Sequence, residues 1–166
     1  TRLRKLDSGD YDALVLAAAG LRRLERGVRI SALLPIELCV PAPGQGIIAV
    51  EVREGDARAA ELIKTFDDAD ASVALRAERA VVDRLGGGCQ MPIGAFAEIT
   101  AGDTLSITSI VVSTDGSRSV RATMQGSVHA PEQLGRQAAD RLLADGADSI
   151  LAEARNAMSP TESHHQ

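Results

Sequence analysis

Hydrophobic residues in the second half of the chain repeat first with the period of a helix. Over residues 71–85 they recur at every fourth position, which predicts a helix with one buried stripe: Val73, Ala77, Val81 and Leu85. The preceding acidic cluster, residues 67–70, offers a side-chain oxygen that can cap the first turn. Four charged residues lie off the stripe, and we expect them to have structural roles: Glu78, Arg79, Asp83 and Arg84.

A strand-like pattern follows this helix. Strand signals cover residues 93–100, 105–110 and 119–128, with turn residues at Gly102-Asp103 and Asp115-Gly116. Alternation in the second strand places three residues on one face: Leu105, Ile107 and Ser109. The pattern predicts a three-stranded antiparallel sheet.

Two helices are predicted after the sheet. The first begins at Pro131, ends at Gly146 and carries one apolar stripe of Leu134, Ala138 and Leu142. The second covers residues 148–156. Residues 67–158 are therefore expected to form an α+β domain in which helices cover one face of the sheet.

The first half of the chain has a different pattern. Residues 12–19 form a continuous apolar run, typical of a parallel strand covered on both faces, and residues 47–52 read as another strand. Short helices are predicted over residues 2–8 and 21–24, and a longer one from Asp56 to about residue 66. Because these strands lack partners and the chain opens at Thr1 without a methionine, we expect a piece of a larger protein.

Composition excludes several classes of function. A net charge of −5 and a pI near 5.2 argue against nucleic acid or an anionic membrane as a partner. No apolar run reaches the ~20 residues of a membrane span, and no signal peptide is evident. Two cysteines make neither a disulfide framework nor a zinc pattern, and His164-His165 is too short for a metal site. The cytoplasm is the expected compartment.

The glycine-rich loop at residues 86–94 is the strongest candidate for chemistry. Three consecutive glycines precede Cys89, and Pro92 follows it, so the loop can present one thiol to solvent. The alternative is a glycine helix stop followed by a small buried cysteine. We interpret the second cysteine, Cys39, as a packed thiol without chemistry.

The sequence from Gly87 to Gly94, GGCQMPIG, resembles the cofactor-attachment loop of the porphobilinogen deaminase (hydroxymethylbilane synthase) family, and the resemblance runs from Thr1 to about Asn156. It implies that Cys89 carries a dipyrromethane cofactor through a thioether. It also implies a transferase of heme biosynthesis that joins four porphobilinogens into hydroxymethylbilane with loss of ammonia. Cys89 follows a helix C-terminus, whose dipole disfavours a thiolate, so we expect a permanent tether.

The resemblance further implies roles for other residues. Arg2 and Arg23, and more weakly Arg22, would bind the acetate and propionate groups of substrate and cofactor, because a guanidinium binds a carboxylate through two hydrogen bonds. Gln45, in the sequence PAPGQG, would contact the cofactor. The catalytic aspartate of the family would lie in an N-terminal part that this sequence lacks, so no catalytic residue is assigned here, and the chain alone is expected to be inactive.

The resemblance also assigns the domains. Residues 1–44 would end a second α/β domain and residues 45–66 would cross back to a first one, both remnants of periplasmic-binding-protein-like domains. Residues 67–158 would form the C-terminal α+β domain, followed by a disordered tail at 159–166. A regulatory or thiol redox-sensing module remains the alternative function, and a solute-binding relative is a third, although it does not explain the cysteine loop.

Overall fold

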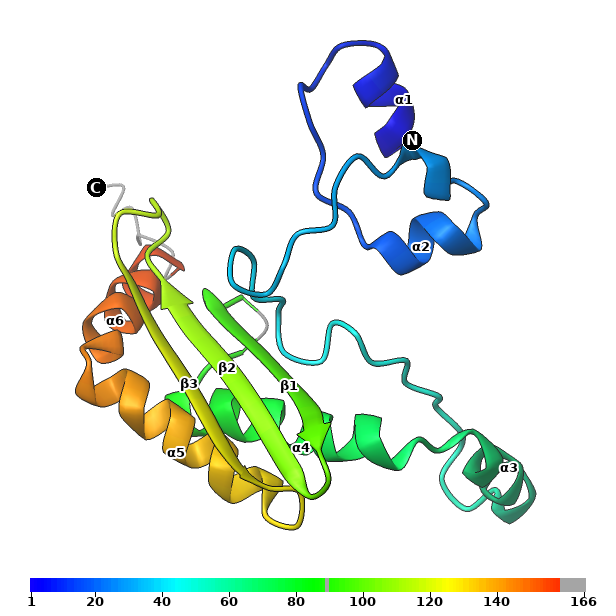
Figure 1. Cartoon of the computed structure of the whole chain (residues 1–166), viewed down its shortest axis with the longest axis vertical. Helices are drawn as coiled ribbons and strands as arrows, with labels where there is room; N and C mark the ends of the chain where they lie inside the picture. The colour runs from blue at the N-terminus through cyan, green and yellow to red at the C-terminus, as the bar shows by residue number, and fades with distance from the viewer. Residues whose placement is uncertain (89, 159–166) are drawn as a thin grey trace, which may run out of the picture. The chain divides into compact units, whose positions relative to one another are not determined.

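The computed structural model describes residues 1–88 and 90–158. The chain divides into two compact units, Thr1–Leu38 and Cys39–Gln166 (Figure 1). Each unit has its own internal contacts, and we describe each separately.

The second unit is built on a three-stranded antiparallel sheet in the order β1-β2-β3. The strands are β1 (Ile93–Ala101), β2 (Thr104–Val112) and β3 (Ser119–Ser127). Helices α4 (Ala69–Leu85), α5 (Pro131–Ala144) and α6 (Ala147–Met158) cover one face of it (Figure 1). The predicted sheet and its covering helices are confirmed, with bounds that differ by one or two residues.

The core of this unit lies between the sheet and the helices. Leu105, Ile107 and Ser109 are fully buried, as the alternation in β2 predicts. The predicted stripes on α4 and α5 are also buried, except that Val73 is only partly so. Half of the buried hydrophobic residues in the described ranges are alanines, so this core has few large side chains.

Helices α4 and α5 pack unusually closely. A Cβ added at Gly135 of α5 would overlap the carbonyl oxygen of Ala77 on α4 and lie 2.8 Å from Ala80 Cβ. Ion pairs join the same two helices: Arg76 Nε lies 2.6 Å from Glu132, and Arg84 Nε lies 2.6 Å from Asp140. Small residues therefore set the helix spacing, and exposed charges flank the contact.

Helix α3 (Ala57–Ile63) and the 3₁₀ turn η2 (Lys64–Phe66) precede α4. The Asp56 side chain accepts a hydrogen bond from the N–H of Ala59, and Asp68 does the same for Ala71 at the start of α4. Both predicted helices are confirmed with their caps. The strand predicted at residues 47–52 is wrong, because this segment lies outside regular structure.

The first unit contains α1 (Arg2–Asp7), α2 (Ala18–Arg23) and the 3₁₀ turn η1 (Gly27–Arg29). Arg29 at the end of η1 forms an ion pair of 2.5 Å with Asp7 at the end of α1. The strand predicted at residues 12–19 is wrong: residues 12–17 lie outside regular structure, and α2 begins at Ala18. A parallel strand needs neighbours for its backbone groups, and the described residues offer none here.

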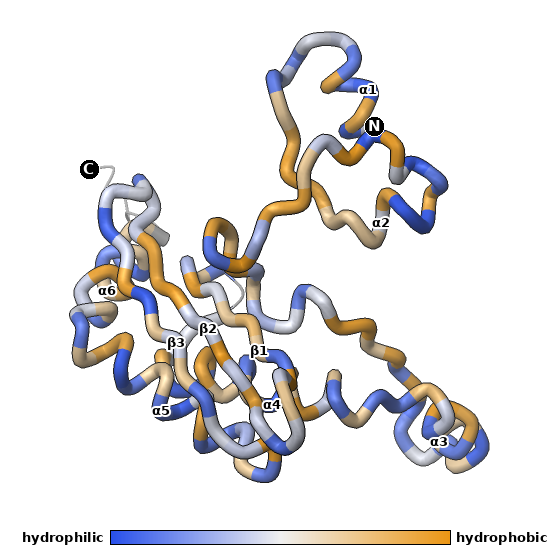
Figure 2. Tube along the Cα trace, in the orientation of Figure 1, coloured by the Kyte–Doolittle hydropathy of each residue, from blue (hydrophilic) through white to orange (hydrophobic). Residues whose placement is uncertain are grey.

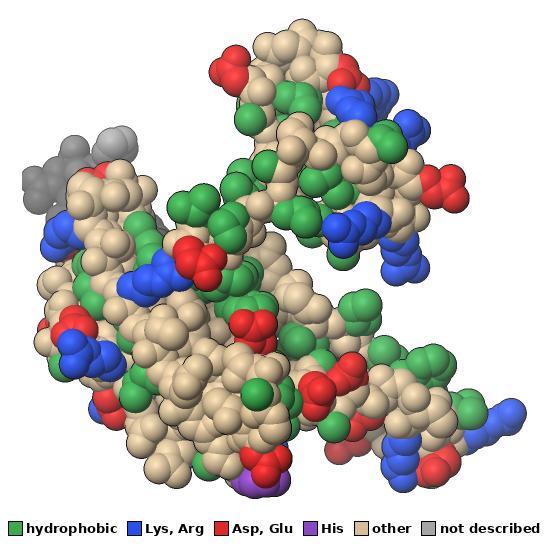
Figure 3. Space-filling view, in the orientation of Figure 1, with side chains coloured by type: hydrophobic (Ala, Val, Ile, Leu, Met, Phe, Trp, Pro, Cys, Tyr) green, Lys and Arg blue, Asp and Glu red, His purple; other side chains and the backbone are tan. Residues whose placement is uncertain are grey.

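Exposed apolar side chains concentrate in the first 66 residues. All the large hydrophobic residues exposed in the described ranges lie there, including Val28 at 94% and Ile48 at 85%. Figure 2 shows hydrophobic stretches along the trace that leads to α3, and Figure 3 shows hydrophobic side chains gathered on the first unit and along that trace. The core residues, in contrast, all fall between Ala74 and Ala154.

None of the helices in the described ranges combines the length and the apolar character that a membrane crossing requires.

Candidate functional site

The glycine-rich loop begins with a Schellman-type helix end. Gly86 adopts a left-handed conformation with φ of 63° and ψ of 35°. Its N–H donates to the Asp83 carbonyl at 3.3 Å, and the N–H of Gly87 donates to the Val82 carbonyl at 3.1 Å. Glycine at this position ends α4 without steric strain.

The next two glycines differ in their surroundings. A Cβ at Gly87 would lie 2.5 Å from Ile93 Cδ1, a buried side chain, whereas a Cβ at Gly88 would meet no atom within 4 Å. The Gly88 carbonyl accepts the N–H of Met91 at 3.0 Å, which closes the loop. The loop is thus packed at Gly87 and open at Gly88.

Cys89, the residue expected to carry the cofactor, lies outside the described residues. At the end of α4 lies a cation that the sequence did not predict. Arg155 of α6 donates from Nη2 to the carbonyls of Leu85 at 2.8 Å and Gly86 at 3.3 Å. This guanidinium offsets the negative end of the helix dipole. Arg155 lies 70 positions after Leu85 in the sequence, and no local pattern links the two residues.

A segment of residues 40–45, which we call the edge segment, lies along the edge of β1 that does not pair with β2. The Ala95 N–H donates to the Pro41 carbonyl at 3.0 Å. At Gly94 a Cβ would lie 3.1 Å from the Val40 carbonyl oxygen, so the absence of a side chain allows the close approach. The end of the glycine-rich loop therefore contacts the edge segment.

Gln45 closes a turn within the edge segment. Its side-chain Oε1 accepts the Ala42 N–H at 3.0 Å, and its own N–H donates to the Ala42 carbonyl at 3.0 Å. The residue is exposed, and its side-chain amide nitrogen can still donate to another group. The contact to Ala42 gives Gln45 a structural role beside the predicted cofactor contact.

Glu78 of α4 holds the edge segment from inside. Its Oε2 accepts the Gly44 N–H at 2.6 Å, its Oε1 accepts the Ala97 N–H at 2.9 Å, and the residue is only 6% exposed. Burial raises the pKa of the Glu78 carboxyl, and the two N–H groups offset only part of that effect. The structural role expected for Glu78 is confirmed, but its burial was not predicted, since its partners are distant backbone groups.

The three candidate arginines belong to the first unit and are exposed. Arg2 starts α1 and lines a hollow of about 290 Å³ between α1 and α2, while Arg22 and Arg23 end α2 and do not line it. None of the three forms a hydrogen bond or ion pair within the described part of the chain, in contrast to Arg29. Their guanidiniums are therefore available to carboxylates.

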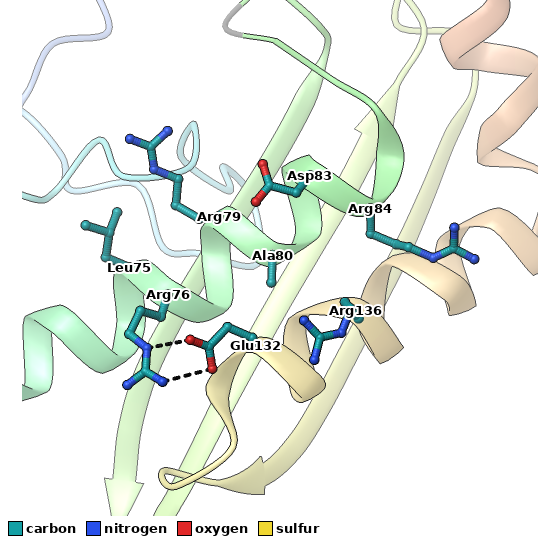
Figure 4. A pocket seen from close by; sticks show the side chains of 8 residues that line it. All are labelled: Leu75, Arg76, Arg79, Ala80, Asp83, Arg84, Glu132 and Arg136. Carbon is teal, nitrogen blue, oxygen red and sulfur yellow. Dashed lines mark hydrogen bonds and ion pairs between the residues drawn. The ribbon is translucent and has the colours of Figure 1, made fainter.

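A second hollow, lined mainly by charged residues, lies between α4 and α5 (Figure 4). This groove of about 600 Å³ is lined by the following charged residues: Arg76, Arg79, Asp83, Arg84, Glu132 and Arg136. Two of its arginines are engaged in the ion pairs between the helices, and Arg76 holds the pKa of Glu132 below its usual value. We therefore assign these ion pairs a structural role, in which they join α4 to α5.

Two further observations concern cysteine and metal chemistry. Cys39 is exposed, so our interpretation of it as a packed thiol is wrong; it lies in a segment without regular structure, next to Leu38, which is 78% exposed. Within residues 1–88 and 90–158, no three His, Cys, Asp or Glu side chains cluster closely enough to bind a metal ion.

Comparison with known proteins links both units to one family. Residues 1–61 match the family model described as "Porphobilinogen deaminase, dipyromethane cofactor binding domain", and residues 73–144 match "Porphobilinogen deaminase, C-terminal domain". These matches include the segments that carry Arg2, Arg22, Arg23 and Gln45.

Curated relatives agree with the family models. Over 152 residues, 92% of this chain, it is 49% identical to the porphobilinogen deaminases of Nitrosomonas europaea and Syntrophotalea carbinolica, covering 49% and 48% of those proteins. It is 48% identical over 153 residues to that of Geobacter metallireducens, again covering 48%. The chain thus spans about half the length of the curated relatives it matches, and it belongs to the porphobilinogen deaminase family.

Proposed function

We propose that this chain forms part of a hydroxymethylbilane synthase, the transferase that joins four porphobilinogens and releases ammonia at each addition. One observation carries the proposal: the loop after α4 places a left-handed, a crowded and an open glycine directly before Cys89. A packed structural cysteine would not require open space at Gly88. The family membership supports the same interpretation.

Cys89 is the proposed attachment point of the dipyrromethane cofactor, through a thioether. The fit rests on the preceding residue, Gly88, where an added side chain would meet no atom within 4 Å. When bound, the cofactor supplies a covalent anchor from which the pyrrole chain is extended. The protein's own contribution in this region is to hold the loop, through the Gly87–Val82 hydrogen bond and through Arg155.

Carboxylate binding is the proposed role of Arg2, Arg23 and Arg22. All three are exposed and free of ion pairs in the described ranges, so each can form two hydrogen bonds to an acetate or propionate group without first losing a partner. Gln45 would donate its remaining amide N–H groups to a polar group of the cofactor.

The complete enzyme would also need a segment equivalent to the other half of its relatives. We propose that this segment pairs with the apolar residues exposed in the first 66 residues and supplies the catalytic aspartate. In this assignment residues 1–44 and 45–66 belong to two periplasmic-binding-protein-like domains, and residues 67–158 form the third. The cytoplasm is the proposed compartment, on the grounds given by the cysteine content.

Intact mass spectrometry with peptide mapping tests the proposal. The complete enzyme, incubated with porphobilinogen, is expected to carry a dipyrromethane mass on the Cys89 peptide and to lose it in Cys89→Ser. Cys39→Ser is the matched control, since it removes the other thiol and should keep the adduct. A reversible glutathione or disulfide adduct on Cys89, with no pyrrole mass, would instead indicate a thiol sensor.

A further inference from the structure

A buried carboxylate without a cationic partner is the least expected feature of the second unit. Glu78 is one of two buried polar residues in the described ranges, and it forms no ion pair there. Burying a charge is costly unless hydrogen bonds compensate, and here two backbone N–H groups are the only compensation. An apolar residue could fill the same space on α4 but would leave the N–H groups of Gly44 and Ala97 without this acceptor, so the carboxylate points to a positional role.

The two partners of Glu78 belong to different parts of the site. Gly44 directly precedes Gln45 and has a φ of 76°, and Ala97 lies in β1, the strand that follows the glycine-rich loop. The two oxygens of one side chain therefore connect the edge segment to that strand.

The same edge of β1 carries a second connection. The N–H groups of Ala95 and Ala97 point away from β2 and would be unpaired at a free sheet edge, but Pro41 accepts the first and Glu78 the second. The turn around Gln45 is closed internally by Ala42, so its attachment to the sheet depends on Pro41 and on Gly44.

We propose that Glu78 is a positioning residue of the cofactor site: by joining Gly44 to Ala97 it fixes Gln45 relative to the strand that follows the glycine-rich loop. This inference rests on the proposed function for its effect on turnover, but the hydrogen bonds themselves can be tested without it. Removal of the carboxylate should leave the sheet and helices folded and release the turn around Gln45.

The chemistry of the contact defines the test variant. Both oxygens accept N–H groups, so a carboxylate satisfies both, whereas the amide of Glu78→Gln offers one acceptor and turns an N–H₂ towards the other donor. Glu78→Gln keeps the volume of the side chain and is expected to fold. Glu98→Gln is the matched control, because Glu98 lies exposed on β1.

Hydrogen exchange of the backbone amides in the 166-residue chain measures the connection directly. In Glu78→Gln the Gly44 amide is expected to exchange about tenfold faster, with the amides of β2 unchanged, and Glu98→Gln should match the wild type. If Glu78→Gln fails to fold, Glu78→Met, which keeps the length and removes both acceptors, replaces it. Unchanged protection of Gly44 in the folded variant would overturn the proposal.

Turnover of porphobilinogen by the complete enzyme then tests the positional role. Glu78→Gln is expected to lower kcat/KM about tenfold at full cofactor occupancy by mass. In a Gln45→Ala background the same change should have a smaller effect, because the two residues would act through one contact. If Glu78→Gln lowered kcat/KM by the same factor in the wild type and in Gln45→Ala, Glu78 would not act through Gln45, and its proposed positioning role would be wrong. An enzyme that never acquires the pyrrole mass would overturn the proposed function and leave the exchange result standing.

Discussion

Asp115 shows how one exposed carboxylate closes the turn between β2 and β3. Its Oδ1 accepts hydrogen bonds from the Ser113 hydroxyl at 2.6 Å, the Ser117 N–H at 3.0 Å and the Ser117 hydroxyl at 2.8 Å. The Ser113 hydroxyl, and after it the two Ser117 groups, lower the pKa of Asp115 from 3.8 to about 2. The charged form therefore stabilises the folded turn.

The pH dependence of stability follows from the sign of this shift. A carboxyl with a lowered pKa contributes stability above its unfolded value, and this contribution is lost as the pH falls from 3.8 through about 2. We expect Asp115→Ala to unfold at a lower temperature than the wild type at pH 7. The difference should shrink between pH 4 and pH 2, as measured by circular dichroism. A difference that stays constant over this range would show that the charge of Asp115 is irrelevant.

The glycines before Cys89 give a second prediction at this scale. Gly86→Ala forces a side chain into the left-handed region, and it is expected to cost about 1 kcal/mol of unfolding free energy. Gly88→Ala is the matched control and should be nearly neutral, since its Cβ would face open space. Urea unfolding of both variants checks this. A loss at Gly88 as large as that at Gly86 would contradict the description of the loop.

At the scale of elements, the contact between α4 and α5 is the most restrictive in the fold. A Cβ at position 135 would collide with the Ala77 carbonyl, which belongs to the backbone and cannot rotate away. Gly135→Ala is therefore expected to destabilise the protein by about 3 kcal/mol or more, although alanine favours helices. Gln137→Ala, exposed on the same helix, is the control and should change stability by less than about 0.5 kcal/mol. Equal unfolding free energies of Gly135→Ala and Gln137→Ala would show that α4 and α5 can move apart at no cost.

The elements after residue 67 could be predicted from the sequence because each has a local signal. The period of four on α4, the alternation in β2 and the Asp115-Gly116 turn all act within a few residues. The predicted strands at 12–19 and 47–52 did not form, because a strand depends on partners that a local pattern does not supply. The sequence therefore predicts strands where a larger sheet would have to complete them.

The candidate site could be predicted only in part, for a related reason. The glycine loop is contiguous in sequence, so the sequence alone makes it a candidate, although Cys89 itself lies outside the described residues. Glu78 and Arg155 were not predicted as supports of the site, because they bind backbone groups that lie 34 and 70 positions away. Backbone partners carry no side-chain signal in a sequence.

At the scale of the whole molecule, stability and exposure are unevenly distributed along the chain. All buried hydrophobic residues in the described ranges fall between Ala74 and Ala154, so the first unit should add little to the stability of the second. A polypeptide of residues 39–166 is expected to unfold at the same urea concentration as the whole chain.

A shorter polypeptide of residues 67–166 provides the contrast. It lacks the edge segment, so Ala95 loses its acceptor and Glu78 loses one donor. We expect it to be less stable than residues 39–166 by about 1–3 kcal/mol. Urea unfolding followed by circular dichroism measures both comparisons. Equal stability of the two polypeptides would show that the edge segment does not support the sheet.

The alanine-rich core has a consequence for how this domain tolerates change. Replacing alanine by glycine removes little volume, whereas at Gly135 the contact between α4 and α5 leaves no room for even one added methyl group. Conversion of Ala77 or Ala138 to valine should therefore be more harmful than conversion to glycine. In a core rich in leucine, shortening a side chain is the more destabilising change, because it leaves an empty cavity. This domain is vulnerable to enlargement.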